Sequence, residues 1–328
     1  MTAGLQRQDL RCEFRAASNP ELKYVRQHCR RPRLGDSYMD SRALMTIASL
    51  AMAFMALAMP VFGADFSDGF ESGARSGTSN GFSWANASNN VQVTGGGQIN
   101  GGYSLEFAYK GKPAEEDAIA VQNFKLTSGV SEIWVRFLLR VPDNYYHRDV
   151  PSSDNNKFLK ISTNPQVSSG EGVNVLWEYN QDGGGGSTLA WHWTIPGIDK
   201  PSSSHSQKTY VFGPSEKGTV QEFVFRLKMA SSAAANDGII QAWHRRSGDS
   251  QLRKIHDLQD APLYPGSSWP TQTQFVAGYI LGWANSSFAS DTTFYLDDVR
   301  VASSSLVGSD SAPQVAPPKP PTDVSASN

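Results

Sequence analysis

Several side chains in the middle of the chain could move protons and hold an acidic substrate. Tyr146 and His147 are adjacent, Asn156 follows soon after, Arg136 precedes them, and His192 lies in a later segment. Histidine and tyrosine can take or return a proton, whereas arginine and asparagine can bind and neutralise a carboxylate. We expect these five residues to be catalytic. Together their types favour removal of a proton next to a carboxylate, which is the chemistry of β-elimination in uronate sugars.

A second set of residues could contact a sugar chain. Exposed lysines attract acidic sugars, a carboxylate can accept bonds from hydroxyl groups, and an indole ring can stack on the apolar side of a pyranose. The residues expected to bind substrate are Lys157, Lys160, Glu178, Trp243 and Trp283.

The same residues also have plainer interpretations, which stay open at this stage. His192 could be a solvated strand residue, and His147 could anchor a loop. Glu178 could form an ordinary cross-strand ion pair with Lys160 or Arg136. Either tryptophan expected to stack on a sugar could equally be buried.

The elements that must position these residues are strands. Polar and apolar residues alternate in 103–109 and 133–141, which is typical of half-buried strands. Further strands are expected over 155–162, 172–179, 188–195, 208–212, 220–229, 238–245, 273–282 and 292–302. Turn residues separate them, and no alternation of strands with helices is visible. We therefore expect an all-β jelly-roll sandwich of two antiparallel sheets.

Alternation also assigns faces within two of these segments. In 173–179 and in 189–195, most aromatic residues share one side, and we expect that side to form the core. Glu178 and His192 fall on the opposite side, together with Arg136 or Arg140 on a neighbouring strand. This opposite side is the expected sugar-facing surface.

The two ends of the β-rich region resemble a known superfamily. DFSDGFESG (65–73) and FYLDDVRV (294–301) resemble the first and last strands of the concanavalin A-like lectin/glucanase superfamily. SEIWVRFLLRVPDNYYH (131–147) and NNKFLKI (155–161) look like its polysaccharide-lyase-like members, of alginate or heparin lyase type, and the superfamily also holds LamG-like modules. The resemblance covers about residues 65–303 and implies a concanavalin A-like jelly roll.

The resemblance also implies a structural calcium ion. In this superfamily the terminal strands lie side by side and often hold calcium, which prefers several oxygen ligands. Asp297 matches the ligating carboxylate, with a backbone carbonyl from the Glu71–Gly73 region as its partner. Alternatively, Asp297 and Asp298 only flank an edge strand.

The resemblance leaves the activity open between classes. Laminarinase-type hydrolases carry Glu-x-Asp-x-x-Glu, and the nearest match, 115–120, ends in Ala120, which removes one of the two carboxylates that hydrolysis needs. The Arg-x-Glu-Leu-Arg and Gln-Ile-His motifs of alginate lyases are absent. We expect a polysaccharide lyase or lyase-like degrader. The alternatives are a non-catalytic carbohydrate-binding or adhesion module and a structural LamG-like domain.

The first part of the chain predicts export. ALMTIASLAMAFMALAMPVF (43–62) has no charge, follows Arg42, and is followed by small residues. We therefore expect a signal peptide over 39–64, a secreted protein (extracellular or periplasmic) of bacterial type, and no stable membrane anchor after cleavage. A transmembrane anchor is the alternative. Residues 1–38 are expected to be an over-extended, unstructured N-terminus, since Met39 begins a normal leader.

Composition narrows the partners. The 29 basic and 31 acidic residues give a formal charge of −2 and are scattered, so nucleic acid is not an expected partner. Both cysteines, Cys12 and Cys29, precede the β-rich region, which excludes a cysteine-based metal site there. The Ser- and Pro-rich segment 304–328 is expected to be a linker or tail, and the expected partner is an extracellular polysaccharide.

Overall fold

The computed structural model describes residues 66–97, 99–150, 155–167, 171–195, 206–265 and 272–308. Regular structure in these ranges consists of strands and one short 3₁₀ turn, Pro214–Glu216. The expected all-β class is confirmed. The predicted signal peptide, the segment before it and most of the predicted tail lie outside the described residues.

None of the helical structure in the described ranges is long and apolar enough to cross a membrane.

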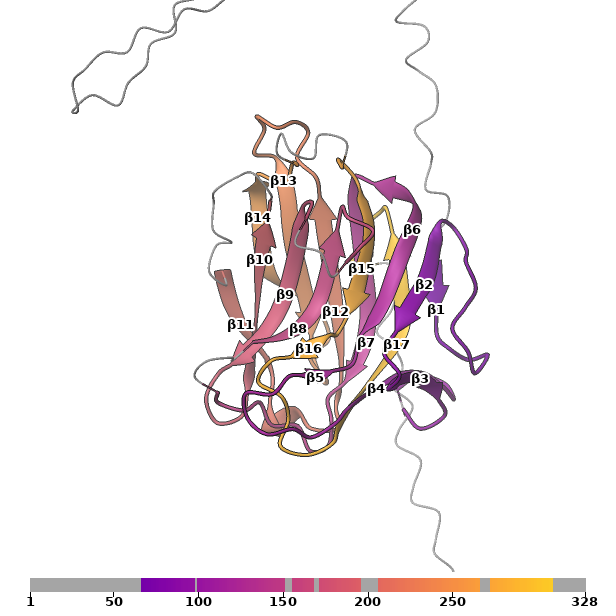
Figure 1. Cartoon of the computed structure of the whole chain (residues 1–328), viewed down its shortest axis with the longest axis vertical. Coiled ribbons are helices and arrows are strands. Elements are labelled where there is room, and N and C mark those ends of the chain that lie inside the picture. Colours follow the sequence, from indigo (N-terminus) through magenta and orange to yellow (C-terminus); the bar gives the residue numbers. More distant parts are fainter. Residues whose placement is uncertain are drawn as a thin grey trace, which may run out of the picture. The chain divides into compact units, whose positions relative to one another are not determined.

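The strands form two sheets, each with antiparallel neighbours (Figure 1). The eight-stranded sheet has the order β14 (Arg253–Ala261), β13 (Gly238–Arg245), β12 (Val220–Lys228), β7 (Glu132–Arg140), β17 (Thr292–Ala302), β4 (Ser104–Tyr109) and β3 (Val91–Thr94), with β1 (Phe66–Asp68) paired to β17. The nine-stranded sheet has the order β11 (Ser206–Phe212), β10 (Ser187–Thr194), β9 (Asn174–Gln181), β8 (Asn155–Ser162), β15 (Phe275–Ile280), β6 (Gln122–Val130) and β2 (Phe82–Ala87), with β16 (Trp283–Ala284) and β5 (Ala118–Ile119) at its side. The predicted jelly-roll sandwich is therefore confirmed.

Aromatic side chains fill the space between the sheets. Phe137 of β7 and Phe223 of β12 pack against Phe158 of β8, with ring centroids 5.7 and 4.9 Å from it. Trp177 and Tyr179 of β9 are fully buried in the same cluster. Burial of this apolar surface is the main force that holds the two sheets together. It also fixes which side of each strand faces outward.

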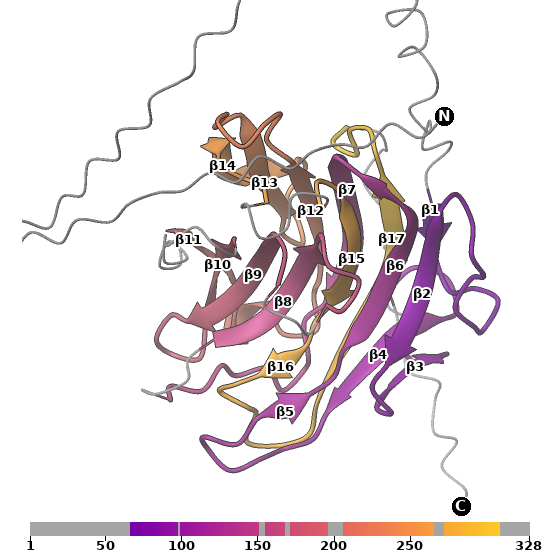
Figure 2. The ribbon, with the colours of Figure 1, turned by 45° about the horizontal axis from the view of Figure 1, so that its top comes forward.

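The first and last strands of the described domain are neighbours. Phe66, Ser67 and Asp68 of β1 pair with Val301, Arg300 and Val299 of β17 (Figure 2). This places the two segments that carry the sequence resemblance side by side. At the other end of the sandwich, the edge strands β11 and β14 approach each other.

Candidate functional site

Polar side chains gather on the outer face of the nine-stranded sheet, over β8, β9 and β10. Trp177 and Tyr179 of β9 point into the core, so the intervening Glu178 points outward. On β10, Leu189 and Trp191 belong to the core, which directs His192 outward. We call the outward-facing Asn155, Lys157, Lys160, Glu178, His192, Tyr279 and Trp283 the outer cluster.

Glu178 is the centre of the outer cluster. Its carboxylate is fully buried, forms an ion pair with Lys157 and accepts a hydrogen bond from Asn155 Nδ2 at 2.9 Å. His192 Nδ1 lies 3.1 Å from its Oε2. A buried carboxylate is stable only when such partners replace its water. Glu178 therefore holds Lys157 and His192 in place beside one another.

Lys160 supplies the group best suited to act as a base. Its Nζ donates a hydrogen bond to the Val167 carbonyl oxygen at 2.6 Å. Burial, and then the positive charge of Lys157, lower the pKa of Lys160 to about 8. A substantial fraction of neutral amine is then present in mildly alkaline solution, and only the neutral amine can accept a proton.

Tyr279 of β15 lies directly opposite Lys160 of β8 in the antiparallel register. Burial, with the negative charge of Glu178, raises the pKa of the Tyr279 phenol, so this hydroxyl keeps its proton at neutral pH. Its ring centroid lies 6.1 Å from that of the half-buried Trp283. Val121 and Leu176 pack beside it and form an apolar wall.

The structure thus brings together five of the residues identified from the sequence, namely Lys157, Lys160, Glu178, His192 and Trp283. The plainer interpretation of Glu178 is partly correct too, because it does form a cross-strand ion pair, and its partner in that pair is Lys157. Sequence reasoning missed Tyr279. The segment 273–282 was expected to be a strand, but nothing in the sequence indicates that it pairs with β8.

His147 does not reach the outer face. It is fully buried, its Nδ1 lies 2.7 Å from Ser187 Oγ, and its ring packs 5.5 Å from that of Tyr179 in the core. The Tyr145 hydroxyl lies 2.6 Å from the same Ser187 oxygen. His147 therefore anchors its loop, and the expectation that it meets the substrate is corrected.

Tyr146 and Asn156 also lie apart from the outer cluster. Tyr146 is 54% exposed and its ring covers the turn at Gly185, where an added Cβ would meet it. Asn156 is fully buried, and its Oδ1 accepts hydrogen bonds from the backbone N and the Oγ of Ser286 at 3.1 and 3.0 Å. Its amide holds a loop, so its expected contact with a carboxylate is corrected.

Arg136 and Trp243 belong to the other sheet. Arg136 lies on β7, with its Nε 2.5 Å from Glu222 Oε1 and its Nη1 2.9 Å from Asp298 Oδ2. Although burial alone would lower the pKa of this guanidinium, the two carboxylates raise it. Trp243 is buried and stacks on Trp134 at 5.4 Å. The expectation that Arg136 shares a surface with His192 is wrong, because alternation defines the side of a strand but not its sheet. The plainer interpretation of Trp243, that it is buried, is correct.

Comparison with known proteins identifies the architecture. No protein-family description and no curated protein matches this sequence. Among solved structures, the alginate lyase Aly36B superposes with a TM-score of 0.50 and 12% identity, over 72% of this chain and 96% of that one. The chain has the concanavalin A-like jelly-roll fold. At 12% identity the likeness concerns the fold alone.

Two other solved structures align over similar lengths. The marine PL-14 alginate lyase from Aplysia kurodai gives a TM-score of 0.46 at 8% identity, over 76% of this chain and 94% of that one. A winged bean acidic lectin in complex with methyl-α-D-galactose gives 0.41 at 11% identity, over 73% and 99%.

Asp297 lies in a separate pocket beside the β1–β17 pair. The pocket has a volume of about 260 Å³ and is lined by Gly69, Glu71, Asn100, Gly101, Asp297 and Asp298. Asp297 is buried and accepts hydrogen bonds from the backbone N of Asp298 and of Asn100. Burial, with the charges of Asp298 and Glu71, raises the pKa of Asp297 to about 7.

The donor set of this pocket suits a hard cation. Three carboxylates line it, and a bound cation would stabilise the ionised form of Asp297 that burial opposes. Within the described ranges, however, no three His, Cys, Asp or Glu side chains converge closely enough to form a complete metal site. Backbone carbonyls would have to supply the remaining ligands.

Proposed function

We propose that the protein is a polysaccharide lyase, or a lyase-like degrader, which cleaves a uronate-containing glycan on the outer face of the nine-stranded sheet. The observation that carries the proposal is the pair formed by Lys160 and Tyr279. A lysine with a pKa of about 8 stands opposite a tyrosine that keeps its proton. These are the two proton-transfer groups that β-elimination requires.

In the proposed mechanism, the neutral amine of Lys160 removes the proton from C5 of a uronate. The electron pair of that C–H bond forms the C4–C5 double bond, and the C4–O bond breaks. The Tyr279 hydroxyl gives its proton to the departing glycosidic oxygen. Lys160 then returns the proton that it took, by way of solvent, to restore Tyr279. No water is consumed, and one product carries a double bond at its end.

Lys157 and His192 are proposed to bind the uronate carboxylate, in the role that the sequence gave to Arg136 or Asn156. Both are already positioned by Glu178, which limits the entropy lost when substrate binds. The C5 proton becomes acidic enough for removal only when the negative charge of the adjacent carboxylate is balanced. The ammonium of Lys157 and the ring of His192 supply hydrogen-bond donors for that purpose.

The second candidate is a carbohydrate-binding module without catalytic activity. Trp283 is half-buried on the outer face and packs against Tyr279, so part of its indole is available to stack on a sugar ring. Trp134, Trp177, Trp191 and Trp243 are buried and play no such part.

The test is incubation of the purified protein with a panel of uronate polysaccharides, following the ultraviolet absorbance of the unsaturated product. Activity on one polymer that falls at least 100-fold in Lys160→Met and in Tyr279→Phe supports the lyase. The matched control is Lys208→Met, which removes an exposed lysine from β11 of the same sheet. No absorbance change, with retardation of the protein in a gel that contains one polymer, would reject the lyase in favour of the binding module.

We also propose that Asp297 holds a structural calcium ion, together with a backbone carbonyl from the Glu71–Gly73 region. Support comes from the carboxylate-lined pocket and from the fold, in which the first and last strands are paired. The ion would supply positive charge that stabilises the joint between these strands.

Export to the periplasm or the extracellular space is proposed on the sequence of residues 39–64. An uncharged apolar run with a basic start and a small-residue exit is the signal that the secretion machinery recognises. N-terminal sequencing of the protein recovered from a bacterial periplasm tests this proposal, and a first residue near Asp65 is expected.

A further inference from the structure

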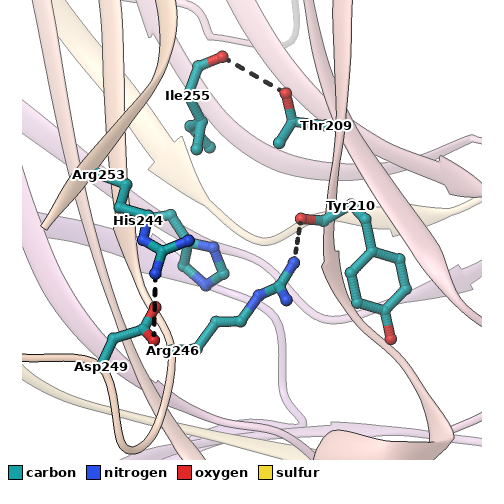
Figure 3. A pocket seen from close by; sticks show the side chains of 7 residues that line it. All are labelled: Thr209, Tyr210, His244, Arg246, Asp249, Arg253 and Ile255. Carbon is teal, nitrogen blue, oxygen red and sulfur yellow. Dashed lines mark hydrogen bonds and ion pairs between the residues drawn. The ribbon is translucent and has the colours of Figure 1, made fainter.

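A second pocket lies at the end of the sandwich where the edge strands of the two sheets approach each other (Figure 3). Its volume is about 150 Å³, and it is lined by Thr209 and Tyr210 of β11, His244 of β13, Arg246, Asp249, Arg253 and Ile255. None of these residues belongs to the outer cluster. The pocket is therefore separate from the proposed substrate face.

The local sequence explains why two arginines meet there. Arg246 ends the β13 side of a hairpin, and the backbone N of Asp249 donates to the Arg246 carbonyl oxygen to close the turn. Gly248 has a φ of +86°, a conformation that residues with a side chain rarely adopt. Arg253 begins β14, so the tight turn brings both guanidinium groups to one pocket.

The pocket has an excess of positive charge. Asp249 is the single acid in its lining and lies 3.8 Å from Arg253, too far for a strong hydrogen bond. Burial, and then the charge of Arg246, lower the pKa of His244 to about 3, so that ring is neutral. Two guanidinium groups therefore face one carboxylate.

Among the described residues, few contacts use the donors of Arg246. Within the described part of the chain its guanidinium makes one hydrogen bond, from Nη2 to the Tyr210 carbonyl oxygen at 3.1 Å. It also lies over the Tyr210 ring, 5.0 Å from the centroid, which holds the planar group still. Figure 3 shows this guanidinium between His244 and Tyr210. Its remaining N–H groups are suited to a planar anion, because a guanidinium can bind both oxygens of a carboxylate.

From these contacts we infer that the pocket binds the acidic group of a small organic anion, a carboxylate or a sulfate carried on a ring such as a single uronate. Arg246 holds the acidic group and Arg253 adds a second contact from the exposed side. Ile255 and the Tyr210 ring offer apolar surface to the rest of the ligand. Asp249 opposes binding and limits the affinity.

The test is calorimetric titration of the full protein with D-glucuronate, with D-glucose as the neutral probe and inorganic sulfate as the anion without a ring. We expect saturable binding of glucuronate at a site that depends on Arg246, and no binding of glucose. Arg246→Gln is expected to weaken binding at least tenfold, because a charge-assisted pair is lost. Lys208→Gln removes a nearby exposed charge on β11 outside the pocket and is expected to leave the affinity within twofold.

Two more variants protect the test against misfolding. Arg253 has a side chain that is 77% exposed, so Arg253→Gln is expected to fold normally and to weaken binding about threefold. Asp249→Asn is expected to tighten binding, since it removes the opposing charge.

Displacement of glucuronate by sulfate supports recognition of the anion alone. Failure of sulfate to displace glucuronate supports a contribution of the sugar ring. Absence of glucuronate binding, or equal loss in Arg246→Gln and Lys208→Gln, would overturn the inference. Both of these overturning outcomes are measured by binding and do not depend on whether the protein is a lyase.

Discussion

Burial and charge at Glu178 control the properties of its neighbours. The carboxylate has no exposed surface, and Lys157, Asn155 and His192 surround it. Lys160 lies just beyond this group, where burial and then the positive charge of Lys157 lower its pKa to about 8. The same short stretch of β8 therefore holds one lysine that forms an ion pair with Glu178 and one whose amine loses its proton near pH 8.

Lys160 leads to a prediction about the pH dependence of the proposed reaction. Only its neutral form can take a proton, so the rate is expected to rise with pH through about 8. Since the charge of Lys157 lowers this pKa, Lys157→Gln should shift the profile to higher pH. The measurement is kcat/KM against pH from 6 to about 10, and an unshifted profile in the variant would contradict this electrostatic coupling.

Glu178 leads to a prediction about stability. Glu178→Gln removes the negative charge that balances Lys157 and is expected to lower the free energy of unfolding by about 1–3 kcal/mol. Urea denaturation followed by tryptophan fluorescence measures this change. The control is Glu116→Gln, whose ion pair with Lys112 is exposed, and its expected cost is below about 1 kcal/mol. Equal effects of the two changes would show that burial does not strengthen the Glu178 contacts.

At the level of elements, the joint between β1 and β17 holds a buried carboxyl group whose pKa is raised to about 7. Asp297 is buried at this joint, near Glu71 and Asp298, and prefers the protonated form below pH 7. Its carboxyl has a pKa of 3.8 when it is not perturbed, so the folded state binds the extra proton between about pH 4 and 7. The contribution of this group to stability is therefore present at low pH and is lost as pH rises through 7.

Calcium is expected to restore the stability that is lost when Asp297 ionises. At pH 8, addition of calcium should raise the melting temperature of the protein, and the chelator EDTA should lower it again. Asp297→Asn is expected to abolish the response to calcium and to raise the melting temperature in EDTA, because the buried charge is gone. Circular dichroism melts at pH 5 and pH 8 measure both effects. A variant that still responds to calcium would place the cation elsewhere.

The strands also differ in how well the sequence predicts them. The segments expected at 155–162, 238–245 and 292–302 coincide with β8, β13 and β17. The strand β14 was missed, because its sequence RKIHDLQDA is mostly polar at the edge of its sheet. The strand β6 was missed as well, because small and polar residues fill its second half. Both lack the apolar alternation that a strand covered on one side displays.

The whole molecule depends on a core that includes two neutral histidines. His256 accepts a hydrogen bond from Trp177 Nε1 and lies 3.3 Å from the Leu189 carbonyl oxygen, while His244 stacks on Phe223. Burial lowers the pKa of His256 to about 4 and, with the charge of Arg246, that of His244 to about 3. The His256 ring joins the two sheets, whereas the His244 ring packs on β12 within the eight-stranded sheet. Because both rings are buried, charging either of them would destabilise the sandwich.

These histidines lead to a prediction about how the stability of the sandwich changes in acid. Unfolding raises their pKa values to about 6.5, so the unfolded state binds more protons below that pH. The free energy of unfolding is therefore expected to fall as pH drops from 6.5 toward 4, by about 1.4 kcal/mol per pH unit for each histidine. Urea denaturation at pH 7, 6 and 5 measures the slope. His256→Gln should reduce the slope by about 1.4 kcal/mol per pH unit and leave the contribution of His244, and an unchanged slope in this variant would contradict the assignment.

The sequence alone determined the fold class and the outward side of two central strands. Period-two alternation depends only on the local backbone, so Glu178 and His192 could be assigned to the face opposite Trp177 and Trp191 without any structure. The expected pairing of the first and last strands was confirmed as well.

Tertiary structure decided which of these residues meet. Arg136 has the alternation of a half-buried strand residue, yet β7 belongs to the sheet opposite β9. Tyr279 faces Lys160 because β15 pairs with β8, although more than a hundred residues separate them in the chain. Local pattern sets only the side of each strand, whereas its sheet and register depend on how all the apolar faces pack together at once. The sequence therefore indicated what each side chain of the outer cluster could do chemically. Only the tertiary structure decided which of these side chains lie together.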